Sequence, residues 1–221
     1  MRIRILVTVL ASFLGTAAST HAGLINGGFE TGDLTGWTTY TTANGTLGGM
    51  EGVVVFDVDG DGDHTHSARF RVGEFQYSNP VREGGGIYQG VMLGAGALVI
   101  SAEIAAFAPS SNLAGGMFEL LFDGAVVDSH DFGLIDASSI ERASLFASFE
   151  VSAGLHEVRL RMTRPWRENH TTPLQYVDDV LLRGAAVSDP PSEPVPEPGT
   201  ITLVGAGLLA LARARRRRRP H

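Results

Sequence analysis

Cysteine is absent from the 221 residues of this sequence. That absence excludes disulfide bonds, thiolate metal sites and a cysteine nucleophile. The fold must therefore rely on its own hydrophobic core. The roughly 165 residues between the two chain ends suffice, because a domain of that size buries about two-thirds of its unfolded surface.

Positive charge is scarce in the body of the chain. Of the 17 Lys and Arg residues, two lie among the first four positions and six among the last nine, and the nine that remain are all arginine. They face 22 Asp and Glu residues, so the body carries a net charge near −13. Such a surface repels phosphate backbones, and we expect no nucleic-acid binding. It suits hard cations such as Ca²⁺, although acidity alone also keeps an exported protein soluble.

Recognisable catalytic motifs are missing as well. The sequence has no Gly-x-Ser-x-Gly, no P-loop, no His-Glu-x-x-His, and no Gly-x-Gly-x-x-Gly in a strand-to-helix context. The Glu-x-Asp-x-x-Glu arrangement of some glycosidases is also absent. We therefore expect that the protein is not an enzyme. A glycosidase or lyase is the lesser alternative, because two opposed carboxylates can cleave a glycoside.

Both ends of the chain have the composition of targeting signals. Arg2 and Arg4 precede the apolar run 5–14, and Ala22 is the small residue that a signal peptidase requires. Residues 1–22 are therefore predicted to be a signal peptide, and a folded domain is predicted over 23–186. A Pro-rich linker over 187–195 then leads into the segment 196–221.

The last segment has three parts in order. Pro196, Glu197 and Pro198 precede the apolar residues 201–212, and six arginines follow. The apolar part predicts a short transmembrane helix in the inner membrane, with the arginines on the cytoplasmic side. This order resembles the PEP-CTERM sorting tail of Gram-negative bacteria that make exopolysaccharide. The resemblance implies recognition by exosortase, a membrane protease, and release to the cell surface or extracellular matrix.

Between the ends, apolar and polar residues alternate at the period of a β-strand. The alternation is clearest in 98–106 and 155–163. Further strands are predicted at 52–58, 67–72, 86–93, 118–122, 125–128, 146–151 and 176–183. Asp123-Gly124 and Ser152-Ala153-Gly154 predict two hairpin turns. About nine short strands predict an all-β fold, either an antiparallel sandwich or a barrel.

A paired motif marks the two ends of the predicted domain. It opens with Asn-Gly-Gly-Phe-Glu at 26–30 and Gly-Trp at 36–37, and closes with Tyr-Val-Asp-Asp-Val at 176–180. This pairing resembles the jelly-roll carbohydrate-binding modules of the xylan- and glucan-binding type. The resemblance implies a jelly-roll-like antiparallel β-sandwich whose first and last strands lie side by side. It also implies a structural Ca²⁺ between Glu30 and Asp178; the alternative is that Asp178 caps a strand and Glu30 is solvated.

A second acidic cluster follows the predicted strand 52–58. Asp57, Asp59 and Asp61 are spaced as at the start of an EF-hand loop, but Ala68 stands where that loop needs a bidentate Glu. We expect either a solvated turn or a Ca²⁺-binding loop. In the second case the loop supplies a further ligand to the ion between Glu30 and Asp178.

Sugar binding requires exposed aromatic rings that stack on the apolar face of a pyranose. Trp166 lies in a polar loop among Arg, Glu, Asn and His, and is predicted to be the main stacking surface, with Tyr77 similar to it. Arg164 and Arg167 are predicted to donate hydrogen bonds to sugar hydroxyls or uronates. Two other aromatic residues are expected in the core: Trp37 and Tyr176.

Three functions remain open at this point. We favour an exported protein that binds polysaccharide at the surface or in the matrix. The alternative is a structural matrix protein without a sugar site, and the glycosidase or lyase comes last. An exposed aromatic side chain beside a groove favours the first, two buried tryptophans favour the second, and a deep cleft with facing carboxylates favours the third.

Overall fold

The structure is a computed structural model that describes residues 24–77, 81–110 and 114–184. Within these residues it contains twelve β-strands and no helix, which confirms the all-β prediction. The described part thus contains no helix long and apolar enough to span a membrane. The predicted signal peptide, Pro-rich linker and transmembrane helix lie outside the described residues, so they stay predictions.

The strands have the following bounds, in chain order: β1 (Thr38–Thr41), β2 (Gly45–Thr46), β3 (Gly52–Phe56), β4 (Thr65–Phe70), β5 (Gly73–Glu74), β6 (Glu83–Leu93), β7 (Gly96–Phe107), β8 (Met117–Phe122), β9 (Ala125–Asp131), β10 (Ile140–Val151), β11 (Gly154–Arg164) and β12 (Leu174–Gly184).

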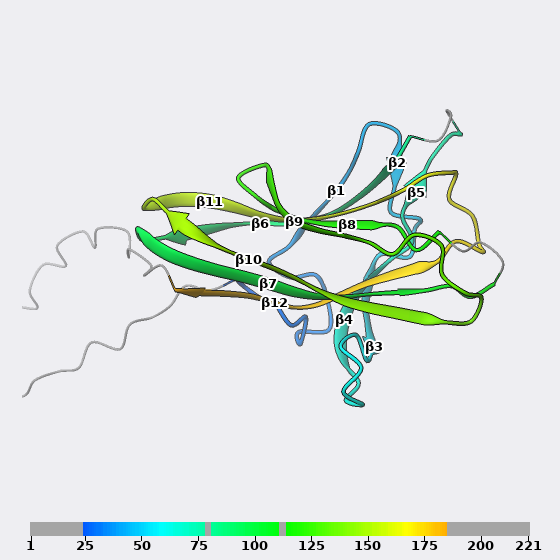
Figure 1. Cartoon of the computed structure of the whole chain (residues 1–221), viewed down its shortest axis with the longest axis horizontal. Helices are drawn as coiled ribbons and strands as arrows, with labels where there is room; N and C mark the ends of the chain where they lie inside the picture. The colour runs from blue at the N-terminus through cyan, green and yellow to red at the C-terminus, as the bar shows by residue number, and fades with distance from the viewer. Residues whose placement is uncertain (1–23, 78–80, 111–113, 185–221) are drawn as a thin grey trace, which may run out of the picture. The chain divides into compact units, whose positions relative to one another are not determined.

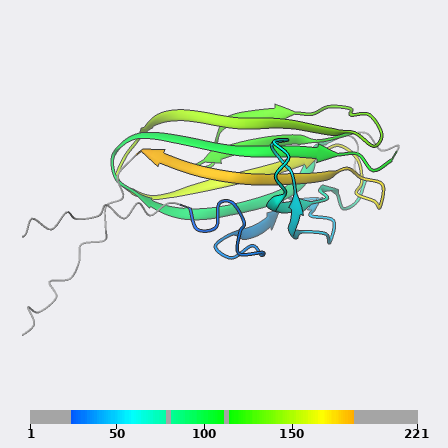
Figure 2. The same ribbon diagram turned by 90° about the horizontal axis from the view of Figure 1, so that it is seen from below.

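Ten of the strands form two five-stranded antiparallel sheets that face each other (Figure 1). The β11 sheet has the order β1-β6-β11-β8-β9, and the β12 sheet has the order β10-β7-β12-β4-β3. Figure 2, seen from the side of the β12 sheet, shows β7 lying between β10 and β12. The chain crosses repeatedly between the sheets, so that β4-β12-β7-β10 faces β6-β11-β8-β9. This is the eight-strand jelly-roll arrangement, as expected.

The core lies between the two sheets. It forms because alternate residues of each strand point inward, which is the period-two pattern seen in the sequence. Leu160 of β11 and Ile100 and Ile104 of β7 are fully or almost fully buried there. Each buried side chain of this size contributes roughly 1.5–3 kcal/mol of hydrophobic free energy.

The hairpin predicted at Asp123-Gly124 is confirmed. Phe122 of β8 pairs with Ala125 of β9 across a two-residue turn. Both turn residues have positive φ, 50° at Asp123 and 79° at Gly124, which is the type I′ geometry that suits the right-handed twist of paired strands.

The hairpin predicted at Ser152-Ala153-Gly154 is wrong. β10 pairs with β7 along its whole length, whereas β11 pairs with β6 and β8 in the other sheet. The turn therefore carries the chain from one sheet to the other. The physical reason is that β10 and β7 are both twelve residues long, so their pairing satisfies more backbone hydrogen bonds than a β10–β11 hairpin that breaks both sheets.

The expectation that the first and last strands pair is also wrong in detail. Residues 24–37 form turns instead of a strand, β1 belongs to the β11 sheet, and β12 lies at the centre of the other sheet. The turn segment nevertheless lies against β12, because the Val180 amide donates a hydrogen bond to the Gly27 carbonyl at 3.0 Å. A Cβ at Gly27 would lie 2.1 Å from the Val180 oxygen, so only glycine permits this approach.

The remainder of the opening motif closes the end of the core. Phe29 is fully buried, and its ring stacks on Trp37 with the ring centroids 5.9 Å apart. The Trp37 indole Nε1 donates to the Asn26 carbonyl at 3.0 Å. Trp37 is only 7 % exposed and Tyr176 is buried, which confirms that both are core residues.

Candidate functional site

Acidic residues from three parts of the chain meet beside β12. They line a pocket with a volume of about 110 Å³, here called the acidic pocket. Its lining consists of Val58, Asp59, Asp61, Asp63, Thr65, Glu103, Asp178 and Asp179. The β3–β4 loop, β7 and β12 thus bring six carboxylates together although they are far apart in sequence.

Asp178 is the buried member of the acidic pocket, with 4 % of the residue exposed. Its Oδ2 accepts a hydrogen bond from the Thr65 hydroxyl at 2.8 Å, and its Oδ1 accepts one from the Asp179 amide at 2.7 Å. Burial raises the pKa of Asp178 to about 6; these hydrogen bonds oppose the rise, and the charges of Asp179 and Glu30 add to it. The fold therefore holds a carboxylate where its negative charge is unfavourable.

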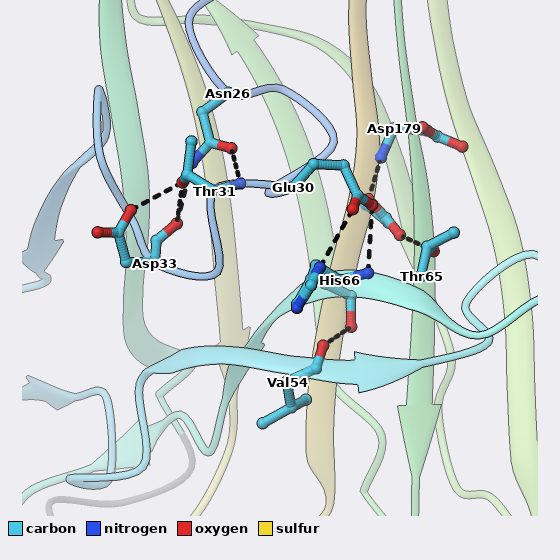
Figure 3. Close-up of polar contacts among 10 residues, drawn as sticks. Asn26, Glu30, Thr31, Asp33, Val54, Thr65, His66 and Asp179 are labelled. Atoms are coloured by element: carbon cyan, nitrogen blue, oxygen red, sulfur yellow. Dashed lines mark hydrogen bonds and ion pairs between the residues drawn. The ribbon is translucent and has the colours of Figure 1, made fainter.

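Glu30 reaches the same region from the turn segment 24–37 (Figure 3). Its Oε1 accepts a hydrogen bond from the His66 amide at 3.3 Å, and its Oε2 lies 3.1 Å from the His66 Nδ1. Because His66 follows Thr65 on β4, these two neighbours connect Glu30 to Asp178. The structure thus brings the two predicted ligands close together, but Glu30 lies at the surface and does not line the acidic pocket.

The Asp-rich loop after β3 shares that pocket in part. Asp57, Asp59 and Asp61 each offer a carboxylate oxygen, and these oxygens lie within 4.8 Å of one another. Asp57 does not line the acidic pocket: its Oδ1 accepts a hydrogen bond from the Gly60 amide at 2.6 Å, and its Oδ2 lies 3.7 Å from Arg142 Nη2. Asp59 and Asp61 line the acidic pocket with Asp178, so the loop and β12 form one group of oxygen ligands.

A second, different site surrounds Trp166 in the loop between β11 and β12. Trp166 as a residue is 43 % exposed and lines a pocket with a volume of about 210 Å³, here called the Trp166 pocket. The other lining residues are Arg82, Ala114, Gly116, Asp131, Gly133, Leu134 and Pro165. An exposed aromatic ring beside a pocket is the feature that favours sugar binding over a purely structural role.

The backbone around Trp166 is held in an unusual conformation. Its φ of 74° lies in the left-handed region that a tryptophan seldom adopts. The Trp166 carbonyl accepts from the Glu74 amide at 3.0 Å, and the Glu74 carbonyl accepts from the Glu168 amide at 2.9 Å. Arg71 Nε then lies 2.6 Å from the Glu168 carboxylate. Strain of this kind persists only where neighbouring contacts enforce it, and it is common at binding sites.

Arg164 supports this loop from beneath and does not reach a ligand. It is fully buried, and it donates from Nε to the Ala114 carbonyl at 3.3 Å and from Nη1 to the Thr172 hydroxyl at 3.1 Å. Burial lowers its pKa to about 10. The prediction that Arg164 donates to sugar hydroxyls is therefore corrected: it lies on the inward face of β11, as the alternation of that strand requires.

The other predicted sugar contacts lie at the surface. Arg167 is exposed directly after Trp166. Tyr77 is 62 % exposed in the loop between β5 and β6, but it does not line the Trp166 pocket.

Sequence reasoning missed Arg82 and Asp131. Arg82 Nη2 and Nη1 donate to the two Asp131 oxygens at 2.5 and 3.3 Å, beside Trp166. Arg82 and Asp131 lie far apart in the sequence, and no sequence pattern predicts their contact unless the strand pairing is known.

The outward face of the β11 sheet carries a third cluster of polar residues, which the sequence analysis did not single out as a site. The Arg159 guanidinium lies over the rings of Tyr40 and Tyr88, 4.5 and 5.2 Å from their centroids. Arg159 also pairs with Glu157 at 2.8 Å, and Arg161 Nε lies 2.6 Å from a Glu119 oxygen. The alternation in 155–163 could have revealed this face. Since each of these charges has a partner, the group stabilises the sheet surface.

Comparison with known protein families identifies the tail. Residues 194–218 match the PEP-CTERM protein-sorting motif, which confirms the sorting tail; Pro196, Glu197 and Pro198 lie within the matched residues. That motif indicates export and exosortase-dependent sorting to the cell surface. Among curated proteins, no relative matches the sequence.

Comparison with solved structures finds jelly-roll modules at low sequence identity. TmCBM61, solved in complex with β-1,4-galactotriose, is 15 % identical with a TM-score of 0.47, over 75 % of this chain and 99 % of that one. The CBM22-1 xylan-binding domain of Paenibacillus barcinonensis Xyn10C is 13 % identical with a TM-score of 0.41, over 78 % and 100 %. A cyclase from Fischerella sp. TAU is 17 % identical with a TM-score of 0.44, over 74 % and 96 %.

Proposed function

We propose that this protein is displayed at the surface or in the extracellular matrix of a Gram-negative bacterium, where its jelly-roll domain binds polysaccharide in the Trp166 pocket. The observation that carries the proposal is the exposed indole of Trp166 beside that pocket, while Trp37 is buried. The sorting tail supports the location. In this proposal exosortase processes the tail, and exopolysaccharide is the natural ligand.

The chemistry of the pocket suits a pyranose ring. The flat indole of Trp166 offers a stacking face for the C–H side of the sugar, and Leu134 and Pro165 add apolar surface. The paired side chains of Arg82 and Asp131 offer a donor and an acceptor to the hydroxyl groups. Sugar recognition needs this combination of an apolar face and a few fixed polar groups.

The proposed role is binding without catalysis. Glycoside cleavage needs two carboxyl groups on opposite sides of the bond. Asp131 is the one carboxylate that lines the Trp166 pocket within the described residues, and Arg82 holds it in an ion pair.

A structural Ca²⁺ is the second part of the proposal, and the acidic pocket fits it. The pocket offers carboxylate and hydroxyl oxygens, which are the ligands that Ca²⁺ prefers. Asp59, Asp61 and Asp178 are the residues that would hold the ion, with Glu30 beside them. Burial, and after it the charges of Asp179 and Glu30, raise the pKa of Asp178, and the positive charge of a bound cation would offset both effects.

Affinity electrophoresis of the full chain tests the binding role. Native gels that contain soluble xylan, galactan, β-glucan or polygalacturonate are compared with a gel without polysaccharide. We expect retardation on at least one glycan, and we expect Trp166→Ala to lose most of it, since stacking on an aromatic ring dominates such sites.

The matched control is Phe75→Ala, because Phe75 is similarly exposed but does not line the Trp166 pocket. This variant should be retarded like the natural chain, and Tyr77→Ala should lie between the two. Failure of every polysaccharide to retard the natural chain would favour the structural matrix role instead.

A further inference from the structure

A second pocket lies along the loop between β9 and β10, with a volume of about 320 Å³. It shares Asp131 and Leu134 with the Trp166 pocket. The other lining residues are His130, Phe132, Ile135, Asp136, Glu141 and Arg142. The two pockets therefore adjoin each other at Asp131 and Leu134.

The combined volume of the two pockets is that of an ordinary ligand cleft. Ligand clefts usually measure about 300–1,000 Å³. The Trp166 pocket, with about 210 Å³, is smaller than that range. The second pocket, with about 320 Å³, lies at the lower end of the range, and the two pockets together fall well within it.

The strip between the pockets is held rigidly. The Gly133 amide donates to Asp131 Oδ1 at 3.0 Å, and the Gly133 carbonyl accepts from the Gly115 amide at 2.8 Å. The Phe132 amide donates to the Gly116 carbonyl at 3.0 Å, and Leu134 forms a β-bridge with Ala114. A site fixed by backbone hydrogen bonds binds at a low ordering cost.

The charges along this surface disfavour an anionic ligand. Arg82 is paired with Asp131, and Arg142 is bonded to Asp57. Asp136 and Glu141 line the second pocket, and neither carboxylate has an ion pair among the residues that the structure describes. Free carboxylates accept hydrogen bonds from hydroxyl groups and repel other carboxylates.

We propose that the two pockets form one groove with two subsites, which binds an uncharged polysaccharide chain across at least two sugar units. Trp166 stacks on one unit, and Asp136 and Glu141 accept hydrogen bonds from the hydroxyls of a later unit beyond Leu134. The inference rests on the proposed polysaccharide binding, and it adds the second subsite and the class of glycan.

Two measurements on the full chain test the groove. The first compares retardation by uncharged xylan, galactan and β-glucan with retardation by polygalacturonate at low salt. We expect retention on an uncharged glycan that exceeds retention on polygalacturonate at least ~10-fold, because free carboxylates repel uronates.

The second measurement is calorimetric titration with a length series, from the disaccharide to the hexasaccharide of the retained glycan. Affinity should rise at least ~10-fold between the shortest and longest ligands. Glu141→Ala, which removes the hydrogen-bond acceptor, should remove most of this gain and leave the affinity for the disaccharide unchanged. Glu51→Ala is the control, because Glu51 is exposed and lines neither pocket.

The results distinguish a failure of the two-subsite groove from a failure of polysaccharide binding as such. Tighter binding to polygalacturonate, or a length gain that survives in Glu141→Ala, would overturn the two-subsite groove while sugar binding at Trp166 stands. Absence of retention on all four polysaccharides would overturn both.

Discussion

The acidic pocket and the Trp166 pocket handle charge in opposite ways. The acidic pocket gathers six carboxylates, and burial keeps the pKa of Asp178 near 6. In the Trp166 pocket the one guanidinium and the one carboxylate among the lining residues neutralise each other at 2.5 Å. The acidic pocket therefore has an excess of negative charge, whereas the charges of the residues that line the Trp166 pocket cancel.

This difference indicates what each region can bind. Like charges that the fold holds together are unfavourable until a cation joins them, and this is the physical basis of the proposed Ca²⁺ site. Charges that are already paired leave stacking and hydroxyl hydrogen bonds as the available interactions, so the Trp166 pocket fits a neutral sugar. The predictions below test this contrast.

The largest expected effect concerns the buried support of the Trp166 loop. Arg164→Ala removes the donors to the Ala114 carbonyl and the Thr172 hydroxyl and leaves a cavity. We expect a loss of about 3–5 kcal/mol in the free energy of unfolding, because partners of a buried charge are left unsatisfied. Urea denaturation measures it. Arg167→Ala, which changes the exposed neighbour, should stay within about 0.5 kcal/mol; equal losses would contradict the assignment of Arg164 as a structural residue.

Calcium should stabilise the fold through the acidic pocket alone. At a free Ca²⁺ concentration one hundred times its dissociation constant, the gain is about 2.7 kcal/mol. Thermal unfolding in Ca²⁺ and in chelator should then differ by roughly 5–10 °C. Asp178→Asn should abolish the difference, whereas Glu51→Gln should retain it. An identical melting temperature with and without Ca²⁺ would count against the metal.

His156 and Asp123 form an ion pair outside both pockets, and this pair should make the stability of the fold depend on pH. His156 Nδ1 lies 2.7 Å from Asp123 Oδ2, and Nε2 lies 2.9 Å from the Ser152 carbonyl. The hydrogen bond to Asp123 raises the pKa of His156 above 6.5, although desolvation opposes it. Desolvation raises the pKa of Asp123. The hydrogen bonds that Asp123 accepts from His156 and from the Glu157 amide outweigh this effect and hold its pKa below 3.8.

The pair should therefore stabilise the fold most between these two pKa values. A raised histidine pKa means that its contribution is complete below about pH 6.5 and is lost as the pH rises through the raised value. A lowered aspartate pKa means that its contribution is lost as the pH falls through the lowered value. We expect the free energy of unfolding to fall between pH 6 and pH 8.5, measured by urea denaturation. The same loss in His156→Gln would show that other groups cause it.

The smallest expected effect on stability is that of Trp166→Ala. The indole is substantially exposed, so the free energy of unfolding should change by less than about 0.5 kcal/mol even though binding is lost. Trp37→Ala empties a buried site and should cost about 3–5 kcal/mol. Comparable losses in the two variants would mean that Trp166 is a core residue.

Much of the fold follows from local sequence patterns. The alternation in 98–106 and 155–163 predicted β7 and β11, and Asp123-Gly124 predicted the turn between β8 and β9. The motifs at 26–30 and 176–180 correctly indicated that the two ends of the domain meet, although the contact between Gly27 and Val180 joins a turn, not a first strand, to β12. The partner of β10 was not predictable, since periodicity shows which face of a strand is buried and not which strand lies beside it.

The sites were predictable to different degrees. Trp166 stood out because a tryptophan in a polar loop has few apolar neighbours to bury it. Arg164, two positions earlier, was misassigned because the end of β11 could not be located to a single residue, and one position decides whether a side chain points inward. Arg82 and Asp131 were missed because their pairing depends on loops that converge only in three dimensions.

Iodide quenching of tryptophan fluorescence tests the central claim most directly, because the chain contains only two tryptophans, Trp37 and Trp166. Buried Trp37 should be protected and exposed Trp166 should be quenched, so about half of the emission is accessible. Saturation with the polysaccharide that retards the protein should abolish the accessible fraction, because the sugar covers the indole. Iodide access that stays unchanged while the glycan is bound would contradict binding at Trp166.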